Sequence, residues 1–513
     1  MLVRGSQSTR MEKVVEGVML EFELAKDFLG KQEEKWNNIK LNMNMKFYST
    51  NNHKKTVNFE TALLKGIPSD YGLYMIDRKD IPKLSKKELA EMHGKSYSDI
   101  AFKVLNLFID REIPERDLKN LLIDAYSKKI IPTKIEKIIG KTYIMWLTGG
   151  PTYSFKDYAA RFYGRVLNYF LKKKKLRRLV IVATSGDTGG AIADALYKLD
   201  NVDVIVFYPS GSISQGQRRQ MTTLDENVYA FEVNGDFDAC QALAKYLLND
   251  KDFAKKVFND SERFTSANSI SIGRLLPQIV YPFYAYSKVK KEFIASIPSG
   301  NFGNMMGTVI AKEMGLPVTK IICGVNENVV FPKFLKTGKY IVQKAKNSPS
   351  SAMVVSHPSN VARLIDFYNG HIYDKREKGR VVEIGVISKM PNLKEMRKDL
   401  ISFSVDNTQH YKTMKEVYDN YKIVLDTHGA VGWRALELFL KGNYNQTAVI
   451  YETADPGKFP DDVKKAVGII SNIPSRIKKQ ESLKERIYPI LGKDFDSQLR
   501  EVKLMMIKIF KNN

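Results

Sequence analysis

The sequence is poor in the residues that build disulfide frameworks and metal centres. Its 513 residues include 2 cysteines, Cys240 and Cys323, and 6 histidines. So few cysteines exclude a disulfide-stapled fold and a cysteine-based metal site, and they fit a reducing compartment. No two histidines stand four residues apart, and no His/Glu zinc motif occurs. We therefore expect neither a structural disulfide nor a bound metal.

Long apolar runs are also missing. No run of about 18 apolar residues occurs, so we expect no membrane-spanning helix and no membrane association. Met1–Arg10 lacks the apolar core of a secretory signal, and the acidic residues from Glu12 to Glu34 argue against a transit peptide. Residues 1–44 are predicted to be an extension with an amphipathic helix at Val14–Leu29. These features predict a cytoplasmic protein.

Basic residues outnumber acidic ones by 81 to 57, which gives a formal net charge of +24. One interpretation is a basic protein that binds nucleic acid or another polyanion, and the cluster Lys172–Arg178 is its best support. The other is that this cluster ends a helix before a strand, where cations interact well with the helix dipole. No basic stripe interleaved with aromatic residues appears. The second interpretation is therefore favoured, and we expect no nucleic-acid partner.

The length and a hydrophobic content of 43% indicate a globular protein with two or three domains. From Leu179 onward, short apolar segments typical of strands alternate with segments of helical spacing. The predicted strands are Leu179–Ala183, Val202–Phe207, Asn227–Val233, Phe293–Ile297, Val318–Cys323 and Ala448–Tyr451. The predicted helices are Asp187–Leu199, Gln215–Thr223, Phe237–Leu248 and Met305–Met314. This alternation predicts an α/β protein with covered parallel sheets. Residues 338–380 are predicted to hold loops and insertions, and Ile477–Phe510 has helical periodicity.

One lysine and two glycine-rich turns stand out on this pattern. Lys156 lies in the turn Pro151–Asp157, directly before a helical stretch that begins at Tyr158. The turns Ser185–Gly190 and Ser299–Asn304 each follow a predicted strand and open a predicted helix, where backbone N–H groups and the helix dipole favour an anion. Neither turn has the ending of a nucleotide P-loop or the spacing of a dinucleotide fingerprint. Lys156 alone would be interpreted as a surface lysine. Together, the three features suggest a Schiff base to pyridoxal phosphate.

Ordered motifs over most of the chain resemble those of threonine synthase, a fold-type-II pyridoxal-phosphate enzyme, in its longer form with an extra N-terminal domain. They are Pro151–Asp157, Ala183–Gly190, Ser266–Ile270, Arg274–Gln278 and Pro298–Asn304, with Gly72–Tyr74, Phe237–Leu243, Asp426–Gly432 and Thr453–Phe459 in support. The resemblance implies a tryptophan-synthase-β-like fold with two doubly wound α/β domains plus an N-terminal domain. The expected segments are an extension (1–44), the N-terminal domain (45–140), the domain of the lysine (141–290), a second α/β cofactor domain (291–470) and a C-terminal helical segment (471–513).

The resemblance also implies roles for single residues. Lys156 would carry the cofactor and shuttle protons, and Thr453 would hydrogen-bond the pyridine nitrogen. The backbone amides around the cofactor phosphate would be those of Gly300, Asn301, Phe302, Gly303 and Asn304. The substrate carboxylate would be held by Ser185, Gly186, Asp187 and Thr188. Candidates for a substrate phosphate are Asn268, Ser269, Arg274 and the loop Ser210–Gln217, since arginine binds phosphate in a bidentate fashion. On the residues alone, Thr453 could simply end a strand, Asp187 or Thr188 could be an N-cap, and Arg274 could be a surface arginine.

The implied reaction converts O-phospho-L-homoserine and water into L-threonine and phosphate, in a monomer or a homodimer. Three positions depart from the family pattern: Ser212 replaces a usually basic residue, Lys333 an arginine, and Asp455 a histidine. These departures leave the cofactor chemistry in place and bear on the choice of substrate. A related phospho-lyase, or an enzyme like threonine or serine dehydratase that releases a keto acid, is the alternative.

Overall fold

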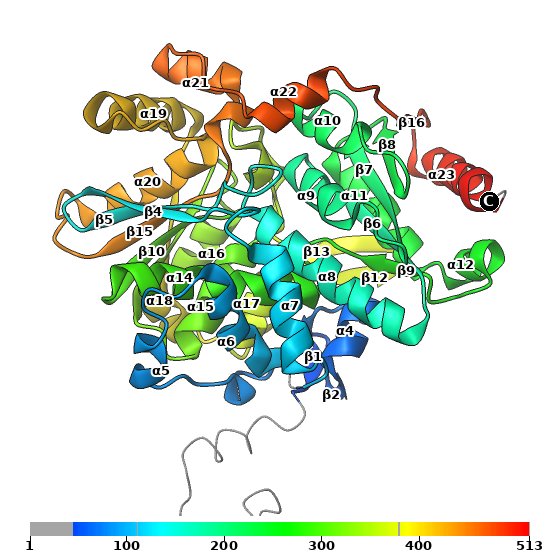
Figure 1. The fold of residues 1–513 in the computed structure, drawn as a ribbon, viewed down its shortest axis with the longest axis horizontal. Helices are drawn as coiled ribbons and strands as arrows, with labels where there is room; N and C mark the ends of the chain where they lie inside the picture. Colours follow the sequence, from blue (N-terminus) through cyan, green and yellow to red (C-terminus); the bar gives the residue numbers. More distant parts are fainter. Residues whose placement is uncertain (1–44, 110, 378–379, 512–513) are drawn as a thin grey trace, which may run out of the picture.

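The computed structural model describes residues 45–109, 111–377 and 380–511, and its architecture rests on two sheets. Figure 1 shows the larger sheet on the left of the molecule and the smaller one on the right. The larger sheet has six strands in the order β14-β11-β10-β15-β5-β4, all parallel except for the antiparallel pair β4 and β5. Its strands are β4 (Lys134–Ile139), β5 (Thr142–Trp146), β10 (Phe293–Pro298), β11 (Val318–Val325), β14 (Leu400–Ser404) and β15 (Ala448–Glu452).

The smaller sheet has five parallel strands in the order β16-β8-β7-β6-β9. Its strands are β6 (Arg178–Ala183), β7 (Val202–Pro209), β8 (Val228–Val233), β9 (Phe264–Ser266) and β16 (Ile487–Ile490). Two parallel sheets linked by helices confirm the predicted fold class. The strand β5 lies within the predicted 141–290 segment and yet pairs with β15 of the larger sheet. The chain therefore crosses between the sheets more than once, and the predicted segment boundaries stay predictions.

Helices cover both faces of each sheet. α9 and α11 lie on opposite faces of the smaller sheet, and α15 and α20 on opposite faces of the larger one. The helices that surround the sheets are α8 (Lys156–Lys174), α9 (Asp187–Leu196), α10 (Gln215–Thr222), α11 (Phe237–Asn249), α12 (Lys251–Phe258), α13 (Ile272–Leu275), α14 (Val280–Val289), α15 (Gly303–Glu313), α16 (Val330–Thr337), α17 (Val361–Phe367), α18 (Leu393–Asp399), α19 (Asn407–Tyr421), α20 (Thr427–Leu440), α21 (Pro460–Val467), α22 (Ser475–Glu481) and α23 (Phe495–Phe510).

Alternate side chains of a central strand enter different cores. In β6, Val180 and Val182 belong to the largest buried cluster, whereas Leu179 and Ile181 belong to a second cluster on the other face. Because successive side chains of a strand point to opposite faces, a strand buried on both faces must be apolar throughout. This requirement explains the short continuous apolar runs of the sequence.

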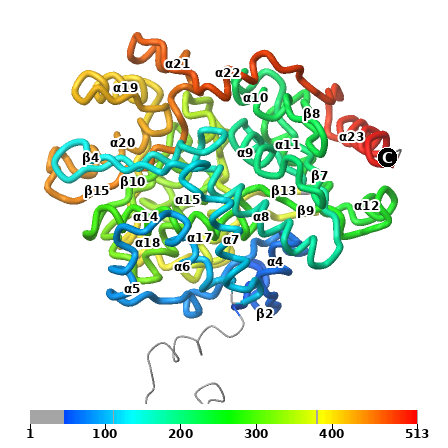
Figure 2. Tube along the Cα trace, viewed as in Figure 1, coloured from blue at the N-terminus to red at the C-terminus, as the bar shows by residue number. Residues whose placement is uncertain are grey.

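The first part of the described chain packs against both sheets through the largest core. Figure 2 shows this blue segment along the lower edge of the molecule. It contains a small antiparallel sheet, β1 (Phe47–Ser49), β2 (Asn52–Val57) and β3 (Tyr74–Met75), and the helices α4 (Phe59–Lys65), α5 (Lys86–Ala90), α6 (Tyr97–Ile109) and α7 (Glu115–Tyr126). No helix of the described residues is both long and apolar enough to span a bilayer. The predicted helix at Val14–Leu29 lies outside the described residues.

Two regions differ from the sequence-based expectation. Residues 338–380, predicted to be loops, include the helix α17 and the strand β12 (His371–Glu377), which pairs with β13 (Arg380–Lys389). The helical prediction for Ile477–Phe510 is wrong at its centre, because Ile487–Ile490 forms β16 at the edge of the smaller sheet. This strand has few residues, and an exposed edge needs no continuous apolar run, so periodicity gave no sign of it.

Candidate functional site

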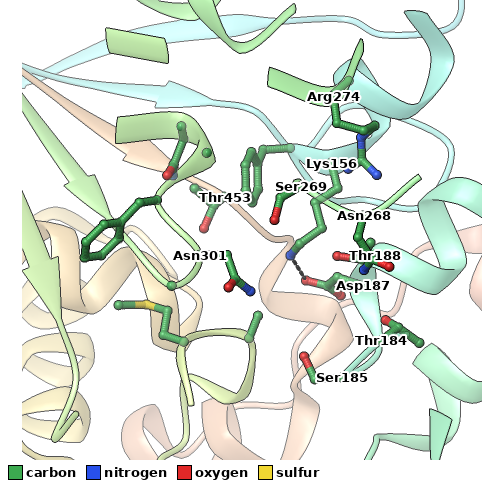
Figure 3. Close-up of a pocket in the computed structure, with 18 of the residues that line it drawn as sticks. Lys156, Thr184, Ser185, Asp187, Thr188, Asn268, Ser269, Arg274, Asn301 and Thr453 are labelled. Carbon is green, nitrogen blue, oxygen red and sulfur yellow. Dashed lines mark hydrogen bonds and ion pairs between the residues drawn. The ribbon is translucent and has the colours of Figure 1, made fainter. Parts of the chain in front are cut away.

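A cavity of about 820 Å³ lies between the two sheets, at the carboxyl ends of β6, β10 and β15. Open α/β sheets bind ligands at this edge. The cavity brings together all but one of the individually predicted site residues, but not the predicted Ser210–Gln217 loop, and Figure 3 shows many of them around it. The residues on its wall are Lys156, Ser185, Asp187, Thr188, Asn268, Ser269, Arg274, Gly300, Asn301, Phe302, Gly303, Asn304 and Thr453. Gly186 is the exception and lies behind the wall, with a φ of 124° that favours glycine.

The turn that carries Lys156 is tied to the end of β15. The Phe155 N–H donates to the Thr453 carbonyl over 2.9 Å, and the Asp455 N–H donates to the Tyr153 carbonyl over 3.0 Å. Lys156 is the first residue of α8, two residues earlier than predicted. These backbone bonds place Lys156 and Thr453 next to each other although almost 300 residues separate them.

The base of the lysine turn is fixed by Asp157. Its carboxylate accepts hydrogen bonds from the Thr152 N–H at 2.8 Å and the Thr152 hydroxyl at 2.6 Å. A Cβ on Gly150 would lie 2.3 Å from the same carboxylate, so only glycine fits there. Burial raises the pKa of Asp157 to about 6, although the Thr152 bonds oppose this shift. The turn is therefore held in one conformation by its own sequence.

The carboxylate of Asp187 joins two lysines. Lys458 Nζ lies 2.6 Å from Asp187 Oδ1 and Lys156 Nζ lies 3.3 Å from Oδ2, as the dashed line in Figure 3 marks for Lys156. Gln217 Nε2 donates to Oδ1 over 2.9 Å. Burial alone would raise the pKa of Asp187, but Lys458 and Lys156 outweigh it and hold that pKa below its ordinary value. Asp187 is thus a buried anion.

The amine of Lys156 is poised by the same group. Burial lowers the pKa of Lys156, the Asp187 carboxylate opposes this, and the charge of Lys458 lowers the pKa further. The side chain is 14% exposed and Nζ reaches the cavity. A lysine with a depressed pKa supplies the neutral amine that Schiff-base and proton-transfer chemistry require.

The start of α9 offers backbone donors to an anion. The Thr184 hydroxyl accepts from the N–H groups of Gly186 and Gly189 at 2.9 and 2.8 Å, which shapes the turn from β6 into the helix. The Asp187 carboxylate is occupied by lysines and would repel a substrate carboxylate. The backbone of Ser185–Thr188 and the hydroxyls of Ser185 and Thr188 are therefore the groups of this turn that suit a carboxylate.

The second anion turn joins β10 to α15. Asn301 is fixed from the predicted loop region, because its Oδ1 accepts from the Ser359 N–H at 3.1 Å and its carbonyl accepts from Asn360 Nδ2 at 2.9 Å. The Phe302 backbone is left-handed, with φ 63°. A Cβ on Gly300 would lie 2.5 Å from the Ala352 carbonyl oxygen, so the turn has no room for a side chain there. The result is a tight backbone cradle at the beginning of an eleven-residue helix.

The three single residues predicted to bind a substrate phosphate differ in whether their side chains are already hydrogen-bonded. The Asn268 amide is already hydrogen-bonded within the protein. Its Oδ1 accepts from the Ala183 N–H at 3.1 Å, and its Nδ2 donates to the Ala183 carbonyl at 2.7 Å. The Ser269 hydroxyl lies 3.0 Å from that of Ser359. Arg274 donates through Nη1 to the Ala267 carbonyl at 2.5 Å, and its buried Nε has no hydrogen-bond partner among the described residues. Arg274 is 3% exposed and borders the cavity, so it is not a surface arginine.

A buried pair of acids, Asp426 and Glu452, lies behind the cavity wall near His428. His428 Nδ1 lies 2.5 Å from Asp426 Oδ1, and Nε2 accepts from the Ala352 N–H at 3.2 Å. The Asp426 N–H donates to Glu452 Oε1 over 2.8 Å. Burial raises the pKa of Glu452 well above its ordinary value, and the Asp426 carboxylate adds to this. A Cβ on Gly429 would lie 1.6 Å from Glu452 Oε2, which accounts for glycine at that position.

The three departures from the family pattern lie at different distances from the site. Ser212 is exposed in the loop before α10, and from the Ser210–Gln217 loop Gln217 is the residue that bonds to Asp187. Lys333 is exposed on α16 and is not on the cavity wall. The Asp455 side chain caps the turn at Lys458 by accepting from the Gly457 N–H at 2.8 Å. Asp455 thus supports the position of Lys458.

Sequence reasoning missed several groups that complete the site. Lys458 and His428 both lie in motifs that resemble the family, but neither residue was assigned a role from the sequence. The signal for Lys458 was its place in the motif Thr453–Phe459, next to the predicted Thr453. Ser359 and Asn360 gave no signal, since they lie in the irregular region before α17.

Comparison with known proteins agrees with this geometry. Three family models match the chain: "Threonine synthase N terminus" at residues 46–126, "Pyridoxal-phosphate dependent enzyme" at 139–385 and "Threonine synthase, C-terminal" at 429–499. The threonine synthase of Escherichia coli is 31% identical over 467 residues, covering 90% of this chain and 99% of the relative. That of Saccharomyces cerevisiae is 34% identical over 483 residues, covering 84% and 92%.

Solved structures give the same result at the level of the fold. The pyridoxal-phosphate-bound threonine synthase of Brucella melitensis matches with a TM-score of 0.79 and 28% identity, covering 91% of this chain and 100% of that one. The threonine synthase of Escherichia coli matches with a TM-score of 0.78 and 30% identity, covering 90% and 99%.

Proposed function

The chain belongs to the threonine synthase family of pyridoxal-phosphate-dependent lyases, and from this premise we propose that its cavity converts O-phospho-L-homoserine and water into L-threonine and phosphate. The observation that carries the proposal is the convergence of Lys156, two helix-opening anion turns and Thr453 on one cavity. A phosphorylated amino acid carries two anionic ends, and these turns with Arg274 can meet both in addition to the cofactor phosphate.

The residues of the cavity fit pyridoxal phosphate. The turn Gly300–Asn304 is a backbone cradle without room for a side chain at Gly300, and it opens α15. The Thr453 hydroxyl lies on the wall and makes no hydrogen bond with the described residues, so it is available to a ring nitrogen. We assign Lys156 as the attachment point, Gly300–Asn304 as the phosphate cradle and Thr453 as the partner of the pyridine nitrogen.

When bound, pyridoxal phosphate supplies an electron sink that stabilises negative charge at the substrate carbon next to the amine. Lys156 Nζ removes the proton from that carbon, and burial lowers the pKa of its amine, which favours the neutral form that can accept a proton. Once protonated, Nζ gains the Asp187 carboxylate, 3.3 Å away, as its counter-ion. Asp187 therefore holds Lys156 Nζ in place after Nζ has taken up the proton, and Lys458 keeps Asp187 ionised.

The substrate ends are assigned to different elements. The backbone and hydroxyls of Ser185 and Thr188 at the start of α9 hold the carboxylate, and Gly186 behind the wall shapes the turn. Asn268, Ser269 and Arg274 form the wall that faces the phosphate group, with Arg274 supplying the charge. A small-molecule substrate is consistent with the pyridoxal-phosphate-dependent enzyme family, whereas a cytoplasmic location and a monomeric or homodimeric state stay predictions.

The test is the product formed from O-phospho-L-homoserine by the purified protein with its cofactor. We expect one equivalent of L-threonine for each phosphate released, and no activity in Lys156→Ala. A related phospho-lyase or dehydratase would release phosphate together with 2-oxobutyrate, because both routes need Lys156 and differ only in the fate of the unsaturated product. Predominant 2-oxobutyrate would contradict the proposal.

A further inference from the structure

A second cavity of about 1070 Å³ adjoins the site and shares part of its wall. Ala183, Phe237, Asn268, Ser269 and Asn301 line both cavities. The shared residues thus include two of the three that face the substrate phosphate in the proposed function. We call this space the adjoining cavity.

Three separate parts of the chain meet around the adjoining cavity. Tyr71 and Gly72 come from the N-terminal part, Gln241 and Lys245 from α11, and Asp374 and Arg376 from the β12–β13 hairpin. The Arg376 guanidinium lies 4.3 Å above the centre of the Tyr71 ring, so the first and third parts are in contact. Residues from all three parts of the chain therefore form the wall of the adjoining cavity.

The charged groups on this wall are mainly basic. Lys245 and Arg376 line it, and Asp374 is the only carboxylate among its lining residues within the described chain. Asp374 is already engaged, since its Oδ1 accepts from the Gly385 N–H at 3.1 Å and lies 3.5 Å from His357 Nε2. An excess of positive charge on a shared wall favours an anionic ligand.

The Lys245 ammonium is the cation without a partner. It makes no hydrogen bond or ion pair with any residue that the structure describes, although its side chain is half-buried on the cavity wall. Burial lowers the pKa of Lys245, and the Asp374 carboxylate only partly offsets this. A half-buried ammonium without a counter-ion gains most from a ligand that brings negative charge.

The first cavity has little free positive charge for a phosphate dianion. Lys458 is bound to Asp187, and Lys156 is needed for proton transfer. Arg274 keeps its charge and an unpartnered Nε, but one guanidinium balances only one of the two charges of a phosphate dianion. The Ser210–Gln217 loop approaches the site through the uncharged Gln217. A second cation beside the shared wall would therefore balance the remaining charge of the substrate phosphate.

We propose that the adjoining cavity receives the phosphate group of the substrate and that the Lys245 ammonium is its charge partner. This inference rests on the proposed function and assigns the substrate specificity of that site to Lys245. It names Lys245 as a binding residue for a phosphomonoester dianion, in addition to Arg274 on the wall of the first cavity. A substrate without the phosphate would leave Lys245 unpaired and bind weakly.

The test compares Lys245→Gln with Lys245→Arg and with the matched control Lys256→Gln, which removes a charge from an exposed site on the neighbouring helix α12. Each full-length holoprotein is titrated with inorganic phosphate by calorimetry, and KM and kcat are measured with O-phospho-L-homoserine. We expect Lys245→Gln to weaken phosphate binding and raise KM by about tenfold, equal to about 1.4 kcal/mol, with a smaller change in kcat. Lys245→Arg should restore most of the loss, and Lys256→Gln should match the parent protein.

The two readouts separate this inference from the proposed function. If the protein makes no threonine, the proposed function fails, and the phosphate titration still decides on Lys245. An unchanged phosphate affinity in Lys245→Gln, or no phosphate binding by the parent protein, would overturn the inference. A fall in kcat with no change in KM or phosphate affinity would also overturn it, because it would indicate a structural effect.

Discussion

At the scale of residues, the site depends on a single carboxylate shared by two lysines. Asp187 lies 2.6 Å from Lys458 and 3.3 Å from Lys156. Lys458 is 1% exposed and also donates to the Thr152 carbonyl at 2.9 Å, so it is fixed in place. Lys156 keeps its freedom to move toward the cavity. The two lysines therefore have different roles: Lys458 keeps Asp187 ionised, and Lys156 acts as the base.

Removing Lys458 should therefore change the titration of Lys156. In Lys458→Met, the charge that lowers the pKa of Lys156 is gone, so that pKa rises toward its ordinary value. Binding of pyridoxal phosphate to the apoprotein needs the neutral amine, and its pH midpoint should move to higher pH. Asp187 would lose its nearer cation and keep only Lys156 and Gln217, which should also lower the unfolding free energy by up to about 3–5 kcal/mol. Stopped-flow absorbance against pH and urea unfolding measure the two effects. Lys464→Met, at an exposed position of α21, is the control, and an unshifted pH profile in Lys458→Met would contradict the account.

At the scale of elements, a hydrogen bond between the acidic residues Asp426 and Glu452 joins the beginning of α20 to the end of β15. Asp426 caps α20 by accepting from the N–H groups of His428 and Gly429, and its own N–H donates to Glu452 at the end of β15. Glu452 is fully buried. Through His428 and the Ala352 N–H, this junction supports the segment that packs on Gly300 of the phosphate cradle. The junction links sheet, helix and cradle.

The protonation of Glu452 makes the unfolding free energy depend on pH. Its pKa in the folded protein is raised, so folding favours the protonated acid. The associated stability is fully present below the ordinary pKa of about 4.5 and is lost as pH rises toward the folded pKa. Glu452→Gln keeps the shape and does not ionise. Between pH 5 and pH 8 its unfolding free energy should therefore gain on that of the parent protein by up to about 1.4 kcal/mol per pH unit. Urea unfolding at both pH values measures the difference, and parallel pH curves would show that Glu452 folds as an anion.

Sequence alone predicted the elements that carry continuous patterns. The strands β6, β7, β10 and β11 were placed within three residues because most of their residues are apolar and buried. The edge strand β16 was missed, and so were Ser359 and Asn360, which fix Asn301. These groups act through tertiary contacts with distant residues, and no local periodicity marks them. The same holds for the orientation of the Asp187 carboxylate toward lysines.

At the scale of the whole molecule, the C-terminal segment completes the smaller sheet. β16 pairs with β8, and α23 buries Val502 and Met506 in the second core together with Ile181 of β6. Figure 1 shows α23 at the outer right edge, beside this sheet. Arg218 and Arg219 of α10 both bond to Glu485, just before β16. The segment therefore belongs to the second core, on the face of the smaller sheet opposite to α9, and is also tied to α10 through Glu485.

Two substitutions on α23 test this role. Met506 is fully buried and Leu504 is 61% exposed on the same helix. Met506→Ala should lower the unfolding free energy by about 2–5 kcal/mol because it leaves a cavity in the core. Leu504→Ala should change it by no more than about 0.5 kcal/mol. Chemical unfolding of both variants measures the difference. Equal effects would mean that α23 does not pack on the smaller sheet.

The central claim is that Lys156, and not its neighbour Lys458, holds the cofactor. Borohydride reduction of the holoprotein fixes pyridoxal phosphate to the lysine that carries it, and peptide mass spectrometry identifies that lysine. We predict the label on Lys156 in the parent protein, and its loss in Lys156→Ala together with the visible absorbance of the cofactor. A label on Lys458 or on any other lysine of the parent protein would contradict the account.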